Sequence, residues 1–245
     1  MYQLHYWPGI QGRGEFVRLA LEASGTPYLD VARGPQEEGQ GLPAMMAVFD
    51  SPDIARPPFA CPFLVDGRRV IGQTAAILHY LGPRIGLVPA GETDRLWVHQ
   101  VQLTIADLVA EAHDVHHPVG SSLYYEEQKD EALRRAEDFR KNRIPKFFGW
   151  FETLLERNPP NNGAVVPHLV GARLSYADLS LYQVVDGLLY ALPKATRRAL
   201  KKTPFLAALH ERIPTHRRVA AYLASERRLP FNEEGIFRHY PELDG

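Results

Sequence analysis

Residues 61–77 have the sequence CPFLVDGRRVIGQTAAI, which predicts a β-hairpin followed directly by a helix. Asp66-Gly67 favours the tight two-residue turn that joins antiparallel strands, and apolar residues flank it on both sides. We expect the two strands at Phe63–Val65 and Arg68–Ile71. The hairpin therefore places an antiparallel strand pair in the sheet.

Strand-like and helical patterns alternate on either side of this hairpin. Upstream we expect a strand, a helix that ends at Gly25, a short strand and an irregular stretch rich in Gly and Pro: Tyr2–Trp7, Arg13–Ser24, Tyr28–Val31 and 33–59. Downstream, a helix at Thr74–Leu81 should end at Gly82-Pro83. Because a helix between two strands permits a parallel pair, residues 1–82 predict a mixed sheet covered by helices, an α/β domain.

Helical periodicity dominates the chain beyond Thr93. We expect long helices, the second of them kinked at Pro145, and then shorter ones: Asp94–His117, Glu126–Asn158, Ser175–Leu192, 204–212 and 215–226. Ser175 and Asp178 are spaced as a capping box. The sequence thus predicts a linker at 83–92 and an all-α domain at 93–245, whose tail from Leu229 onward packs on the body.

Composition narrows the function classes. In 245 residues, 28 Lys and Arg balance 29 Asp and Glu, which argues against a protein that coats nucleic acid. The single cysteine, Cys61, excludes an internal disulfide framework. The sequence has neither an apolar run of roughly 20 residues nor a signal-peptide pattern at its start. We therefore expect a cytoplasmic protein that binds neither membrane nor nucleic acid.

Three positions could bind a small molecule. A cis bond at Cys61-Pro62 would expose backbone groups to an extended peptide, although the sequence leaves the isomer open. Gln73-Thr74 begins a helix, where Thr74 can act as the cap and free N–H groups attract a carboxylate. The phenol of Tyr6, at a strand end, could donate to an anion. A trans turn proline, a plain helix cap and a buried aromatic are the ordinary alternatives.

Together these segments resemble a known family. Tyr6-Trp7 with Gly12–Leu19, Cys61-Pro62, Gln73–Ile77 and Ser175–Asp178 resemble, in this order, the tyrosine-type (mu/pi/sigma-like) cytosolic glutathione S-transferases, over nearly the whole chain. The resemblance implies a thioredoxin-like N-terminal domain with a mixed four-stranded sheet, followed by an all-α helical bundle. It also implies a homodimer and a transferase role in detoxification.

The activity implied by the resemblance is conjugation of glutathione to a small hydrophobic electrophile, with Tyr6 as the catalytic residue. A free thiol has a pKa of about 8.5, so little of it is ionised at neutral pH. A hydrogen bond from a phenol to the thiolate contributes about 1.5–3 kcal/mol and lowers that pKa. Glutathione is then a co-substrate, and no metal is expected.

By position in the family, the Cys61 backbone before Pro62 would pair with the cysteinyl part of glutathione, and Gln73 and Thr74 would hold its γ-glutamyl carboxylate. Trp7 would line the edge of the tripeptide.

Three further roles follow from the resemblance at other positions. Arg56 is the candidate for the glycyl end, Asp107 for the glutamyl amine of the neighbouring subunit, and His117 for the electrophile pocket. The chain departs from the family at Gln11, where many relatives have Arg, and by one residue inserted between Trp7 and Gly12. The insertion shifts the loop beside Tyr6.

Several alternatives remain open at this point. A glutathione-dependent lyase, isomerase or peroxide reductase would keep Tyr6, and a non-catalytic ligand-binding or scaffolding protein could share the fold. His113, His116 and His117 cluster, but a metal would need a third well-placed ligand. Cys61 lacks the Cys-x-x-Cys context of a redox nucleophile. The run 194–228, with ten basic and two acidic residues, is either a solvated face or an anion-binding patch.

Overall fold

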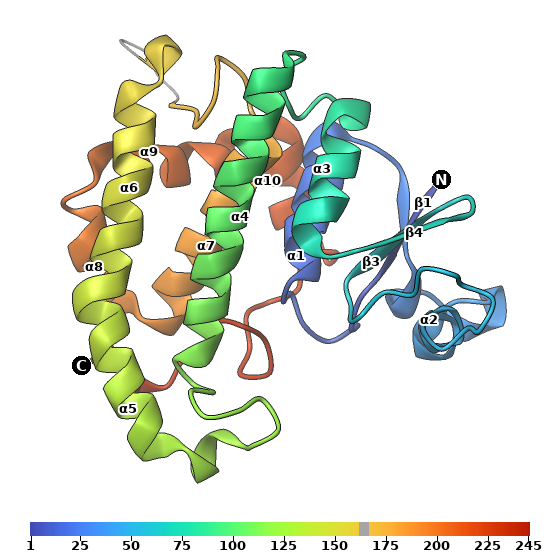
Figure 1. Ribbon diagram of the computed structural model, residues 1–245, viewed down its shortest axis with the longest axis horizontal. Helices are drawn as coiled ribbons and strands as arrows, with labels where there is room; N and C mark the ends of the chain where they lie inside the picture. The colour runs from blue at the N-terminus through green and yellow to red at the C-terminus, as the bar shows by residue number, and fades with distance from the viewer. Residues whose placement is uncertain (162–166) are drawn as a thin grey trace. The chain divides into compact units, whose positions relative to one another are not determined.

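A computed structural model of the chain describes residues 1–161 and 167–245 (Figure 1). Its contacts divide the chain into two compact units, residues 1–87 with 216–230 and residues 88–215 with 231–245. Within the described residues, no helix is both long enough and apolar enough to cross a membrane.

The first unit is built on a four-stranded sheet with the order β2-β1-β3-β4. β1 (Tyr2–His5) pairs in parallel with β2 (Tyr28–Asp30) and antiparallel with β3 (Phe63–Asp66), which forms the expected hairpin with β4 (Arg69–Gly72). Gly67 has a positive φ of 59°, as the tight turn requires. The mixed α/β sheet predicted from the sequence is confirmed.

Helices cover both faces of this sheet. Figure 1 shows α1 (Gly14–Ser24) and α3 (Thr74–Ile85) on one face and α2 (Gly41–Phe49) on the other. Leu4 and Leu64 point into the core beneath α1 and α3, whereas Phe63 packs on Met45 of α2. This alternation follows from the two-residue period of a strand, which sends neighbouring side chains to opposite faces.

Two local predictions in this unit are wrong. The stretch 33–59 is not wholly irregular, because it contains α2 together with the 3-10 turn Gln36–Glu38; Pro43 is accommodated in the first turn of α2, where no intrahelical N–H bond is lost. Gly82-Pro83 does not end α3, which continues to Ile85. Gly86, with a φ of 72°, ends it instead.

The second unit is all helical, as expected, with α7 at its centre and α4, α8 and α9 packed against α7. The bounds of its α-helices are α4 Glu92–Asp114, α5 Lys129–Asp138, α6 Ile144–Arg157, α7 Tyr176–Ala191, α8 Pro193–Leu200, α9 Pro204–Arg212 and α11 Pro241–Asp244. The 3-10 turns lie at Tyr125–Glu127, Pro159–Asn161 and Ile213–Thr215.

The long helix expected at Glu126–Asn158 is interrupted. A π-helical turn, Phe139–Arg143, separates α5 from α6, and Pro145 lies in the first turn of α6. Because proline has no N–H to donate, the regular hydrogen-bond ladder cannot pass through it, and a wider turn accommodates the break. The helix α8 was not anticipated.

The capping box at the start of α7 is confirmed. Ser175 N and Oγ both donate to Asp178 Oδ2, at 2.7 and 2.8 Å, and Asp178 N donates to Ser175 Oγ at 3.4 Å. Asp178 is fully buried and also accepts from Leu169 N at 2.7 Å. The capping box therefore fixes both the start of α7 and the approach of the preceding loop.

The boundary between the two units, after Leu87, lies inside the expected linker 83–92, but a later segment is assigned differently. The segment that connects α3 to α4 is shorter than expected and comprises residues 86–91. Residues 216–230, which include α10 (Arg217–Leu223), belong to the first unit and not to the second; we call them the return segment. α10 packs on α1, and this long-range packing has no local sequence signal.

Candidate functional site

Tyr6 follows β1 directly and is 5% exposed. Its Oη accepts a hydrogen bond from Arg13 N at 2.9 Å, so the loop with the inserted residue still closes on the ring. A Cβ at Gly12 would overlap Tyr6 Oη, and a Cβ at Gly14 would lie 2.6 Å from the ring. These two glycines are therefore the residues that let the loop wrap around Tyr6.

The phenol of Tyr6 is held in its protonated form. Burial raises the pKa of Tyr6, and the Arg13 N–H with the charges of Arg13 and Arg18 lowers it by less. Because Oη accepts from Arg13, its own proton is left for a second acceptor. The residue is thus a neutral hydrogen-bond donor at physiological pH.

The strand register brings the three predicted motifs together. His5 of β1 is paired with Phe63 of β3, and Phe63 with Gly72 of β4. The next residues, Tyr6, Pro62 and Gln73, therefore lie at the same end of three adjacent strands. The Cys61-Pro62 peptide bond is cis, which is the isomer that the resemblance implied.

The start of α3 differs from its expected capping. Gln73, not Thr74, occupies the cap position, and no side chain caps the helix. Gln73 has a φ of 63°, which a residue other than glycine rarely adopts and which is frequent at functional sites. Thr74 Oγ1 instead donates to Arg13 O at 3.4 Å. The backbone of Arg13 thus contacts both Tyr6 and α3.

The thiol of Cys61 is unsuited to nucleophilic chemistry. Burial raises the pKa of Cys61 to about 11, and its Sγ lies 3.8 Å from Met45 Sδ. At neutral pH the side chain is therefore a thiol and not a thiolate. This argues against the redox alternative.

Trp7 and Arg56 are the other predicted residues of the first unit. Trp7 is 43% exposed beside Tyr6. Arg56 lines a cavity of about 620 Å³ with Asp53, Arg68 and Tyr80. Neither Gln73 nor Pro62 lines this cavity.

The second unit carries Asp107 and His117. Asp107 is exposed on α4, and His117 lies just beyond the end of that helix, with its Nδ1 2.5 Å from Nδ1 of His116. Burial and the charge of Arg238 lower the pKa of His117. Across 1–161 and 167–245, no group of three His, Cys, Asp or Glu side chains is arranged to hold a metal ion.

Sequence reasoning missed a buried charge network beside Tyr6. Arg18 is fully buried, with its guanidinium 5.8 Å from the centre of the Tyr6 ring. Its Nε donates to Asp30 at 2.7 Å and its Nη1 to Glu15 at 3.4 Å. Burial opposes the charge of Arg18, but Asp30 and Glu15 outweigh it and raise the pKa of Arg18. A permanent positive charge therefore faces the phenol.

Glu15 joins this network to the return segment. It is fully buried and accepts from Tyr222 Oη at 2.6 Å and from Arg228 Nη1 at 2.5 Å. The one signal in the sequence is a pair of opposite charges, Glu15 and Arg18, on the apolar face of a helix. No sequence pattern indicates that Tyr222 and Arg228, more than 200 residues away, contact Glu15.

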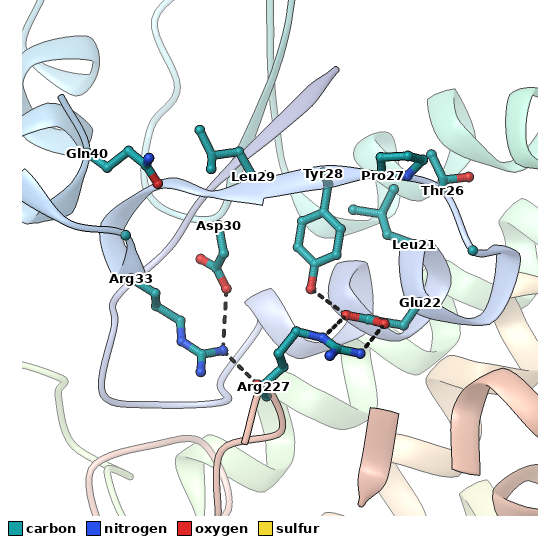
Figure 2. A pocket seen from close by; sticks show the side chains of 12 residues that line it. Leu21, Glu22, Thr26, Pro27, Tyr28, Leu29, Asp30, Arg33, Gln40 and Arg227 are labelled. Atoms are coloured by element: carbon teal, nitrogen blue, oxygen red, sulfur yellow. Dashed lines mark hydrogen bonds and ion pairs between the residues drawn. The ribbon is translucent and has the colours of Figure 1, made fainter. Parts of the chain in front are cut away.

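Hydrogen bonds at the surface also hold the return segment against the rest of the first unit. Figure 2 shows Arg227 against Glu22, with two hydrogen bonds of 2.9 and 3.0 Å, and Arg33 reaching the backbone of Arg227 at 2.7 Å. These groups line a cavity of about 500 Å³ whose charges are matched, since Arg33 also lies 3.6 Å from Asp30. The charged groups that line this cavity therefore bind one another and hold the return segment in place.

Comparison with known proteins gives a consistent result. Residues 113–226 match the family model "Glutathione S-transferase, C-terminal domain". Glutathione S-transferase P 1 of Xenopus laevis is 28% identical over 93% of each chain, and a glutathione S-transferase of Plasmodium falciparum is 25% identical over 91% of this chain and 95% of that protein. A solved pi-class glutathione S-transferase of Onchocerca volvulus shares the fold, with a TM-score of 0.70, 23% identity and coverage of 96% and 98%.

Proposed function

We propose that the chain, which is similar to glutathione S-transferases over nearly its whole length, conjugates glutathione to a small hydrophobic electrophile by stabilising the glutathione thiolate with Tyr6. The observation that carries the proposal is the meeting of Tyr6, Pro62 and Gln73 at one end of the sheet, with the phenol neutral and its proton available.

In the proposed complex, glutathione extends along the Cys61-Pro62 backbone. Its γ-glutamyl carboxylate binds at Gln73 and Thr74, where the uncapped N–H groups of α3 carry partial positive charge. Antiparallel pairing at Cys61 then directs the cysteinyl sulfur toward Tyr6 Oη. Trp7 lines the edge of the tripeptide, and Arg56 binds the glycyl carboxylate.

The chemistry then needs one donor. The thiol loses its proton to solvent, and the Tyr6 hydroxyl donates a hydrogen bond to the thiolate, which contributes about 1.5–3 kcal/mol. Since one pKa unit corresponds to about 1.4 kcal/mol, the thiol pKa falls by one to two units. The thiolate attacks the electrophilic carbon, and a carbon–sulfur bond forms as the leaving group departs with its electron pair. No covalent bond to the protein is involved.

We assign the electrophile pocket to the second unit, with His117 on its wall. In a cytoplasmic homodimer, Asp107 of one subunit would bind the glutamyl amine of the glutathione in the other. The exposure of Asp107 is consistent with this role.

Replacing Tyr6 with Phe tests the proposal with 1-chloro-2,4-dinitrobenzene as a general aromatic electrophile. The lost hydrogen bond should lower the conjugation rate by roughly 10- to 100-fold, while the affinity for glutathione stays unchanged. The absorbance of the bound thiolate, followed against pH, should show a raised thiol pKa. Tyr2→Phe, in the same strand, is the matched control and should conjugate normally. Equal rates for the two variants would move the activating role away from Tyr6.

A further inference from the structure

Gln11 lies in the loop between β1 and α1 and is the residue at which the chain departs from the family it resembles. Its side chain is polar, yet the residue is only 5% exposed. The side-chain Nε2 donates to Leu229 O of the return segment at 2.5 Å. Its backbone O accepts from Glu15 N at 3.0 Å and from Arg18 Nη1 at 3.3 Å. Because buried polar groups are almost always hydrogen-bonded, these contacts fix the place of Gln11.

The return segment reaches this region through two consecutive residues. Leu229 accepts from Gln11 through its carbonyl, and Arg228 Nη1 donates to the carboxylate of Glu15 at 2.5 Å. Residues 228–229 therefore hold both the loop before α1 and the first turn of that helix. All of these residues belong to the first unit.

The loop depends on such contacts because it contains neither helix nor strand and because glycines flank Gln11. Gly9 and Gly12 lie on either side of it, and Gly12 has a φ of 43°. Glycine loses more conformational entropy on folding than any other residue, so contacts with the rest of the molecule must offset that cost. The side-chain amide of Gln11 supplies such a contact two residues before Arg13.

Arg13 links the position of the loop to the chemistry of Tyr6. Its N–H donates to Tyr6 Oη at 2.9 Å. A hydroxyl that accepts a hydrogen bond is polarised, so its own proton becomes a better donor to a second acceptor. The same N–H lowers the pKa of Tyr6, although burial raises it by more. A loop displaced at Gln11 would carry the Arg13 N–H away and weaken the phenol as a donor.

We propose that Gln11 is a positioning residue for Tyr6. Its hydrogen bond to Leu229 O holds the loop in the place from which Arg13 N reaches Tyr6 Oη. The return segment then contributes to thiolate stabilisation through the loop and not by binding glutathione itself. This inference rests on the proposed function, because it concerns the strength of the Tyr6 hydroxyl as a donor to the thiolate.

Gln11→Met tests the proposal, because methionine has a side chain of similar length and no N–H to donate. Gln11→Asn, whose amide is one methylene shorter, is a second variant that stays polar. Arg227→Met is the matched control: it removes the hydrogen bonds of the return segment to Glu22 and leaves those of Gln11 and Glu15 in place. Tyr6→Phe is measured beside them. The readouts are the conjugation rate with 1-chloro-2,4-dinitrobenzene, the KM for glutathione and the pKa of the bound thiol, all below the unfolding midpoint of each variant.

We expect both Gln11 variants to conjugate roughly 2- to 10-fold more slowly than wild type, as the loss of one neutral hydrogen bond implies. The pKa of the bound thiol should rise by roughly 0.3–1, with the KM for glutathione unchanged. Arg227→Met should match wild type in all three readouts.

A wild-type thiol pKa in the folded Gln11 variants, or an equal rise in Arg227→Met, would overturn the positioning role. Tyr6→Phe separates this failure from that of the proposed function. If it raises the thiol pKa while the Gln11 variants do not, only the role of Gln11 fails. If it leaves the thiol pKa unchanged, the proposed function fails as well.

Discussion

At the scale of single residues, Gly12 and Gly14 decide whether Tyr6 can occupy its position. We predict that Gly12→Ala or Gly14→Ala forces the ring aside and lowers conjugation more than about 10-fold. Gly12 also has a φ of 43°, so alanine at this position should lower the free energy of unfolding by a further ~1–2 kcal/mol. Thermal unfolding and conjugation rates measure the two effects. Gly9→Ala, whose Cβ meets no atom within 4 Å, is the control and should behave as wild type.

Buried histidines make stability depend on pH. Burial, opposed in part by Asp30, lowers the pKa of His5 to about 4, and burial lowers the pKa of His116 to about 3. In the unfolded chain both titrate near 6.5, so the unfolded state binds more protons below that pH. We predict that the free energy of unfolding falls as the pH drops from about 6.5 to about 4.

Urea titrations at several pH values measure this slope, and His5→Phe should reduce it. Neither ring nitrogen of His5 has a hydrogen-bond partner among the described residues, and the ring stacks on Phe63 at 4.4 Å. Phe at position 5 should therefore also be at least as stable as His at pH 7. A slope unchanged by the substitution would mean that His5 is charged in the folded state.

At the scale of elements, short sequence motifs predicted the turns and helix ends that depend only on neighbouring residues. The Asp66-Gly67 hairpin, α1 with its Gly25 end and the Ser175 capping box follow from turn and cap chemistry, and the structure confirms them. Pro83 was misjudged, because tertiary packing decides whether a helix tolerates a proline. The kink expected at Pro145 lies where the π-helical turn separates α5 from α6.

The candidate site divides in the same way. Tyr6, Cys61-Pro62 and Gln73 were expected from short motifs, and strand pairing brings these motifs together. The sequence left the isomer of the Cys61-Pro62 bond open, and the structure has it cis. Arg228 on Glu15 was not expected, because the two residues are separated by more than 200 positions and no local rule joins them.

The return segment offers a matched pair for testing its energetics. Arg228 binds the fully buried Glu15, whereas its neighbour Arg227 binds Glu22 at the surface with its side chain 57% exposed. We predict that Arg228→Met costs about 3–5 kcal/mol of unfolding free energy, because it leaves a buried charge short of a partner. Arg227→Met should cost about 1 kcal/mol or less. Urea unfolding measures both, and similar losses would show that Glu15 is not the critical partner.

At the scale of the whole molecule, the proposed site requires a second copy of the chain. Light scattering should give twice the chain mass of 27.6 kDa at micromolar concentration. In that dimer, Asp107→Asn should weaken glutathione binding without changing the mass, because it removes the charge proposed to face the glutamyl amine. Asp94→Asn, on the same helix, is the control. A monomeric protein that turns over normally would contradict the assignment of Asp107.

The order of translation has a consequence for the return segment. The sheet, α1 and the loop around Tyr6 emerge first, yet Tyr222 and Arg228, which complete the surroundings of Glu15, emerge only after helices α4 to α9 of the second unit. The first part to be translated is thus among the last to be finished. A nascent chain stalled before residue 216 would hold the buried Glu15 without Tyr222 and Arg228 as its partners.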